Sequence, residues 1–197
     1  MKILEDYNHL WKLLETDIPV DFLPFFEKQL KNIPDGYTGL INYMNGILSL
    51  KQNDHQRALN YFFEATNINP EKVGPKLHYI YTTMEMNIAD ESKEGYYRDY
   101  FLYQLSYLNS VQIESFVLAI NGLKKIWDKQ KLSGIEDCKK AEVKGNNFYP
   151  TLYIVTRAYG EVGDLNSFTS RWNQLQLINP RVTEVERLIF RAKSNRF

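Results

Sequence analysis

The side chains that could do acid–base or metal chemistry are few and widely spaced. The 197-residue chain has three histidines, His9, His55 and His78, and one cysteine, Cys138. The three imidazoles fall in separate predicted helical units, so a metal site or a nucleophile with its base would require distant segments to converge. The sequence contains no GxxxxGK[ST] phosphate loop, no dinucleotide-type glycine loop and no HExxH motif. We therefore expect no catalytic site, no metal site and no cofactor.

The single cysteine and the first residues of the chain bear on where the protein works. One cysteine cannot form a disulfide framework or a thiolate metal cluster, and we expect Cys138 to be a buried small apolar side chain. Glu5 and Asp6 fall where a signal peptide would have its apolar core. No later run approaches the ~18 apolar residues that a membrane-spanning helix needs. These features predict a cytoplasmic protein without a membrane partner.

Aromatic side chains are the most unusual feature of the composition, and they gather in residues 95–107. If that stretch is helical, four tyrosines spaced by three or four residues share one face. This tyrosine row consists of Tyr96, Tyr100, Tyr103 and Tyr107. An exposed row would offer a partner a large contact area at low entropic cost. A buried row would instead pack against neighbouring helices, with its hydroxyl groups reaching solvent.

The elements that would position these residues are predicted to be helices. Apolar side chains recur at three- and four-residue spacing along most of the chain, and strand-like alternation is nearly absent. The pattern is clearest in residues 39–72, where small side chains fall at a helix crossing, apolar ones face the seam and a proline ends the second helix. The residues that form it are Gly46, Ala58, Phe62, Ala65 and Pro70. Asp54 lies in the predicted turn and is suited to cap the second helix.

At these spacings, residues 39–72 resemble one tetratricopeptide repeat, a helix–turn–helix unit of about 34 residues. Two later units keep the same frame, and the unit at 73–114 is eight residues longer. In that unit we expect one helix from Gly74-Pro75 through Ile88 and a second from Asp90 or Ser92 to about Asn109, with the additional residues in the second helix or in the loop after it. The resemblance implies an all-α fold, a right-handed α-α superhelix (solenoid) of about five helical hairpins plus a C-terminal capping helix. It would form a single domain over residues 1–197. The expected units are approximately 3–38, 39–72, 73–114, 115–148 and 149–182, with the cap at 183–197.

Proteins of this family generally hold a partner's peptide or helix in a concave groove lined by the first helix of each pair. Carried over by position, the resemblance implies that eight residues face such a groove. They are Tyr43, Ile47 and Leu50 in 39–72, Tyr81 and Glu85 in 73–114, and Tyr153, Arg157 and Glu161 in 149–182. The groove would be aromatic with few charges. Tyr43 and Ile47 stand where one branch of the family has a lysine and asparagine clamp, which disfavours a receptor for carboxyl-terminal chaperone peptides.

Charge is balanced overall but not along the chain. The 24 basic and 24 acidic side chains create no net field toward nucleic acid or an anionic membrane. Residues 1–122 have 10 basic and 16 acidic side chains, whereas residues 123–197 have 14 and 8. Seven lysines gather between residues 124 and 144, but four carboxylates are interspersed among them. This pattern is typical of a solvated face rather than of a phosphate-binding surface.

A small helical-repeat chain without a catalytic pattern is expected to act by binding. The leading prediction is a non-catalytic protein–protein interaction module, an adaptor or scaffold with a partner's peptide or helix in the groove. A narrower alternative is a bacterial immunity or chaperone-type protein that sequesters one dedicated effector or toxin. A third, disfavoured alternative is RNA binding through the basic second half and exposed tyrosines. We expect a monomer or a weak homodimer.

Overall fold

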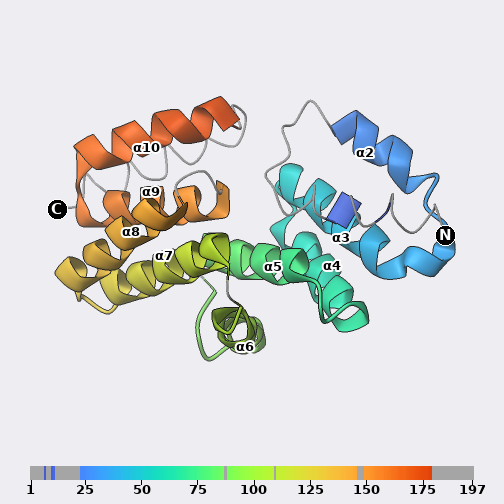
Figure 1. Cartoon of the computed structure of the whole chain (residues 1–197), viewed down its shortest axis with the longest axis horizontal. Coiled ribbons are helices and arrows are strands. Elements are labelled where there is room, and N and C mark those ends of the chain that lie inside the picture. Colours follow the sequence, from blue (N-terminus) through green and yellow to red (C-terminus); the bar gives the residue numbers. More distant parts are fainter. Residues whose placement is uncertain are drawn as a thin grey trace. The chain divides into compact units, whose positions relative to one another are not determined.

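The computed structural model describes residues 7, 10, 11, 23–86, 88–108, 110–145 and 149–178. Within this part every regular element is a helix, which confirms the predicted all-α class for the described residues (Figure 1). The helices before the middle of the chain are α2 (Leu23–Leu30), the short 3-10 helix η2 (Asp35–Tyr37), α3 (Thr38–Lys51), α4 (His55–Ile68) and α5 (Val73–Glu85). They are followed by α6 (Lys93–Ser106), α7 (Val111–Trp127), α8 (Lys131–Gly145), α9 (Tyr149–Val162) and α10 (Leu165–Ile178). Most of the predicted first helix, and the cap at 183–197, lie outside the described residues.

The chain divides into two compact units, Met1–Gln104 and Leu105–Phe197. The division falls near the end of α6, so the first unit contains the helices from α2 to most of α6. The second contains α7 to α10. Each unit has its own buried apolar core. The single domain expected from the sequence stays a prediction, and the two units are described separately.

In the first unit, α3 and α4 form the helical hairpin that the sequence predicts. Asp54 caps α4, since its Oδ1 accepts a hydrogen bond from the backbone N–H of Arg57 at 3.2 Å. A Cβ atom added at Gly46 would overlap the Phe62 ring, and Ala58 is fully buried. The prediction that small residues occupy this helix crossing is confirmed.

Helix α6 is shorter than the sequence suggested. Ser92 caps it by accepting a hydrogen bond from the N–H of Gly95 at 2.9 Å, and it ends at Ser106 rather than near Asn109. Helix α5 likewise ends at Glu85, three residues before the expected Ile88. The eight additional residues of this unit therefore lie in the connections before and after α6, not in a longer helix.

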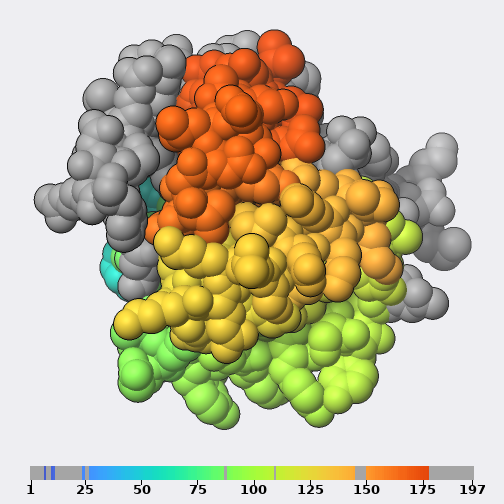
Figure 2. Space-filling model, turned by 90° about the vertical axis from the view of Figure 1, so that its left-hand side faces the viewer, coloured from blue at the N-terminus to red at the C-terminus, as the bar shows by residue number. Residues whose placement is uncertain are grey.

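In the second unit, α7 and α8 cross at two glycines. A Cβ atom added at Gly122 would lie 2.7 Å from Cys138 Sγ and 2.7 Å from the carbonyl oxygen of Gly134, so only glycine allows this approach. Helices α8 and α10 also meet, because Arg171 on α10 donates to the carboxylate of Glu142 on α8. Figure 2 shows these two helices, α8 in yellow and α10 in orange, as neighbours on one face of the unit.

Candidate functional site

Tyr43, the first of the predicted groove residues, lies in the core of the first unit. Its side chain has no exposed surface. The ring stacks on Trp11 at 5.4 Å between centroids and meets the Phe62 ring edge-on at 6.0 Å. The Tyr43 hydroxyl oxygen lies 3.0 Å from Nδ1 of His78, which is also 3.1 Å from the carbonyl oxygen of Gly74. Tyr43 is therefore part of a closed aromatic cluster.

The other groove residues of the first unit are buried or paired. Ile47 and Tyr81 are buried, and Leu50 is half-buried. The half-buried Glu85 places its Oε2 atom 3.2 Å from Nε2 of His55. The hydrogen bond and charge of Glu85 raise the pKa of His55 despite its partial burial. Glu85 thus joins the end of α5 to the start of α4.

The groove residues of the second unit lie on α9. Tyr153 and Arg157 are buried, and Glu161 is half-buried. The Arg157 guanidinium lies over the Trp127 ring, 5.1 Å from its centroid, and its Nε atom is 3.8 Å from Glu161 Oε1. The charge of Arg157 therefore interacts, within the unit, with the ring of Trp127 and the carboxylate of Glu161.

Burial changes what the predicted groove residues can do in this structure. A side chain in a closed core offers a partner no surface, and this applies to five of the eight. The five are Tyr43, Ile47, Tyr81, Tyr153 and Arg157. Position in the repeat could not reveal this burial, because it depends on which other helices cover each residue. The binding role of the eight residues stays a prediction.

The tyrosine row is the exposed aromatic feature of the structure. The exposed fractions are 65% for Tyr96, 46% for Tyr100, 62% for Tyr103 and 70% for Tyr107, which follows the end of α6. The sequence left open whether the row faces inward or outward. The structure places it outward, while Phe101 on another face of α6 is buried against Tyr79 at 5.2 Å between ring centroids.

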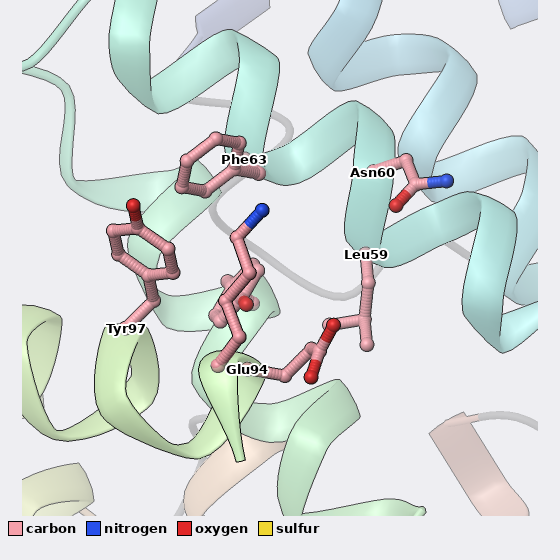
Figure 3. Close-up of a pocket in the computed structure, with 7 residues that line it drawn as sticks. Leu59, Asn60, Phe63, Glu94 and Tyr97 are labelled. Atoms are coloured by element: carbon pink, nitrogen blue, oxygen red, sulfur yellow. The ribbon is translucent and has the colours of Figure 1, made fainter.

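A small hollow lies between α6, α4 and α5 in the first unit (Figure 3). Phe63 and Tyr97 meet edge-to-face beside it, with ring centroids 4.6 Å apart, and Glu94 and Leu59 also line it. Its volume is about 60 Å³. At about 10–15 Å³ for each water molecule, this space holds a few waters and is well below the roughly 300 Å³ of a small ligand pocket, so we interpret the hollow as a gap beside large aromatic rings.

A buried arginine fixes the start of α6. Arg98 has no exposed surface, and its guanidinium is paired with the carboxylates of Asp90 and Asp99. Its Nη1 atom also donates to the carbonyl oxygen of Ile88 at 3.0 Å. Satisfied in this way, the buried charge ties the preceding connection to the helix that displays the tyrosine row. This role could not be predicted from the sequence, since it depends on how the connection folds back.

The second unit contains a larger groove, of about 390 Å³, between the end of α6, α7 and α8. Its apolar walls are formed by Leu105, Leu108, Val117 and Leu118. Charged side chains stand around them: Lys144 Nζ lies 2.5 Å from Glu114 Oε2, and Lys140 Nζ lies 3.8 Å from Asp137 Oδ1. All the lining residues belong to the second unit. The sequence shows these lysines, whereas the groove depends on how the helices pack.

Burial sets the protonation state of two of the side chains that could do chemistry, Cys138 and His78. No group of three or more His, Cys, Asp or Glu in the part of the chain that the structure describes could hold a metal ion. Cys138 is buried, as predicted, and burial together with nearby carboxylates raises the pKa of its thiol to about 12. Burial lowers the pKa of His78 to about 4. Both groups are therefore uncharged near neutral pH, and His9 lies outside the described residues.

Comparison of the chain with models of protein families, with curated proteins and with solved structures gives no match. Among the described residues, no helix has the length and apolar character to cross a membrane. The surfaces of the two units are therefore the basis for assigning a function.

Proposed function

We propose that this chain is a non-catalytic protein–protein interaction module, an adaptor or scaffold built as a tetratricopeptide-like right-handed superhelix. Support for the architecture comes from three helical hairpins, α3/α4, α7/α8 and α9/α10, each joined by a short turn. The α3/α4 crossing at Gly46 and Phe62 follows the pattern of the repeat. Such hairpins stack into solenoids that present extended surfaces to partners.

The tyrosine row is the observation that carries the proposal. Three of its members, Tyr96, Tyr100 and Tyr103, project from one face of α6 with about half or more of each side chain exposed. Tyrosine combines a large apolar ring with a polar tip and has few rotatable bonds, which is why it is enriched in binding hot spots. We assign the partner-binding surface to this face of α6, not to the buried residues of the predicted groove.

The contacts that hold α6 in place make the tyrosine row suitable for binding a partner protein. Arg98 and the Ser92 cap hold the start of the helix, and Phe101 and Tyr97 pack its other side against α5 and α4. A helix held at these points loses less conformational entropy when a partner binds than an unanchored helix would. The row therefore presents a preformed aromatic surface.

Ion pairing favours a protein partner over RNA. In the lysine-rich region, Lys125 Nζ lies 2.6 Å from Asp137 Oδ2, and three further carboxylates, those of Asp128, Glu136 and Glu142, are interspersed among the lysines of the sequence. Lysines paired with carboxylates neutralise fewer phosphates, which weakens the electrostatic term that dominates nucleic-acid binding. An apolar tyrosine surface depends much less on salt than such a term does.

Affinity capture from the native lysate in moderate salt tests the proposal. We expect wild-type protein to retain a protein partner after nuclease treatment and Tyr96→Ser/Tyr103→Ser to lose it. Circular dichroism should show that both fold, because the replaced side chains are exposed. Retention of the same partner by the double variant, or loss of all captured material on nuclease treatment, would reject the assignment.

A further inference from the structure

The apolar groove of the second unit has the size and lining of a binding site. Its volume of about 390 Å³ is within the range of small-molecule binding pockets, which is roughly 300 to 1,000 Å³. Leu105 is fully buried at its base, Val117 and Leu118 are half-buried, and Leu108 is 39% exposed at its edge. A partner's apolar side chains would therefore remove water from a surface that is already concave.

The charges around the groove select the chemistry of the occupant. The lining of the groove includes two lysines, Lys140 and Lys144, and one carboxylate, that of Glu114. Lys140 is largely exposed, and its contact with Asp137 is long at 3.8 Å because Lys125 holds that carboxylate at 2.6 Å. A carboxylate of a partner could therefore approach Lys140 without breaking a close ion pair.

Lys144 and Glu114 form an exposed ion pair at the edge of the groove, and a carboxylate of a binding partner could replace Glu114 in this pair. Both side chains are more than 40% exposed, and exposed ion pairs of this kind contribute little net stability. A partner carboxylate that replaced Glu114 at Lys144 would cost the fold little. Conversely, Glu114 repels an incoming acidic residue, so its charge is expected to limit affinity.

We propose that this groove binds an acidic amphipathic helix of a partner protein. Its apolar side chains would lie against Val117, Leu118 and Leu108, and its carboxylates would reach Lys140 and Lys144. The spacing of three and four residues on a helix places apolar and acidic side chains on adjacent stripes, which matches an apolar groove with lysines on its rim. This inference rests on the proposed function, and it adds a second surface with a partner of defined chemistry.

The probe is a capped, fluorescein-labelled peptide of about twelve residues, long enough for three helical turns. Leucine recurs in it at three- and four-residue spacing, and glutamate fills most other positions. One control peptide has lysine in place of glutamate, and another has serine in place of leucine. Fluorescence anisotropy with the full chain should show saturable binding of the acidic peptide only.

Matched variants of the full chain locate the site. We expect Lys140→Gln/Lys144→Gln and Val117→Ser each to weaken binding of the acidic peptide by roughly fivefold or more, and Glu114→Gln to strengthen it. The controls are Lys139→Gln and Val143→Ser on α8, which remove an exposed lysine and a side chain that is 89% exposed outside the groove. Both controls should bind like the wild type.

Four outcomes would overturn the inference. The first two are equal binding of the basic peptide and a loss of binding in the control variants as large as in the groove variants. The other two are displacement of the peptide by decanoate at a lower concentration than by unlabelled peptide, and a homodimer of the chain that Val117→Ser dissociates. The last two would assign the groove to a lipid carboxylate or to a second copy of the chain. None of them involves Tyr96 or Tyr103. Failure here therefore leaves the capture experiment on the tyrosine row to be judged separately.

Discussion

At the scale of single residues, the aromatic cluster of the first unit encloses the imidazole of His78. Burial is the main cause of its lowered pKa of about 4, the hydrogen bond with Gly74 opposes that shift, and the charge of Lys51 adds to it. The neutral imidazole packs against the rings of Tyr43 and Phe62 at 5.6 and 5.4 Å between centroids. We interpret His78 as a packing residue that makes the first unit sensitive to acid.

The first prediction concerns the pH dependence of stability through His78. The folded-state pKa of about 4 lies below the ordinary value of 6.5, so the unfolded chain binds the proton more tightly. The stability contributed by the neutral His78 side chain is fully present above pH 6.5 and is lost as the pH falls toward 4. Between these limits we expect the unfolding free energy of the wild type to fall by about 3 kcal/mol more than that of His78→Phe. Urea denaturation across this window measures the difference, and parallel curves would contradict the account.

The contribution of His55 to stability should depend on pH in the opposite direction to that of His78. The pKa of His55 is raised above 6.5, chiefly by the hydrogen bond to Glu85, so its contribution is fully present below pH 6.5 and is lost as the pH rises through the raised value. We expect His55→Gln to lose under about 1 kcal/mol at about pH 6 and less at about pH 8, because the pair is partly solvated. Thermal or urea unfolding at both pH values tests this. An equal cost at both would mean that the ion pair contributes nothing.

At the scale of elements, the α7/α8 crossing depends on close backbone approach. For Gly122→Ala we expect a net loss of about 1 to 2 kcal/mol, because overpacking against Cys138 and Gly134 exceeds the helix-propensity gain of replacing glycine. Chemical denaturation measures this loss. The Cys138 thiol, buried in the wild type, should also react faster with a thiol reagent in the variant.

Gly36→Ala in η2 is the matched control, since no atom lies within 4 Å of an added Cβ there. Its stability should stay within about 0.5 kcal/mol of the wild type. If Gly122→Ala were equally neutral, the crossing would be looser than described.

Local patterns were sufficient to predict the helical hairpins. The spacing of Gly46, Ala58 and Phe62 predicts the α3/α4 crossing, and Asp54 predicts where α4 begins, because packing at a crossing and capping depend on nearby residues. The same reasoning placed the end of α5 at Ile88 instead of Glu85. Helix ends without a strong stop residue depend on tertiary contacts that the sequence does not display.

The candidate surfaces could be predicted only in part. The three- and four-residue spacing places the tyrosines on one face of a helix, but which face is covered depends on the packing of Phe101 and Tyr97 against other helices. The role of Arg98 depends on a connection that returns to the helix, and the groove beside Val117 requires the end of α6 to lie near α7. These arrangements involve residues distant in sequence, and a repeat pattern carries no information about them.

At the scale of the whole molecule, two units of opposite charge present two different surfaces. The first has 10 basic and 15 acidic side chains and exposes tyrosines, whereas the second has a net charge of +5 and an apolar groove rimmed by lysines. A partner held by the tyrosine row should dissociate little as salt rises, and one held at the lysine rim should weaken with salt. Salt dependence therefore separates the two contributions.

The most direct test of the central claim is the affinity of the captured partner for the purified full chain, measured by calorimetric titration of the wild type and two double variants. We predict that Tyr96→Ser/Tyr103→Ser weakens binding by roughly tenfold or more, since truncating hot-spot aromatic residues costs over about 1 kcal/mol each. Leu132→Ser/Leu177→Ser removes two exposed apolar side chains elsewhere and should bind like the wild type. Equal affinity of all three proteins, or a loss confined to the leucine variant, would contradict a protein-binding surface on α6.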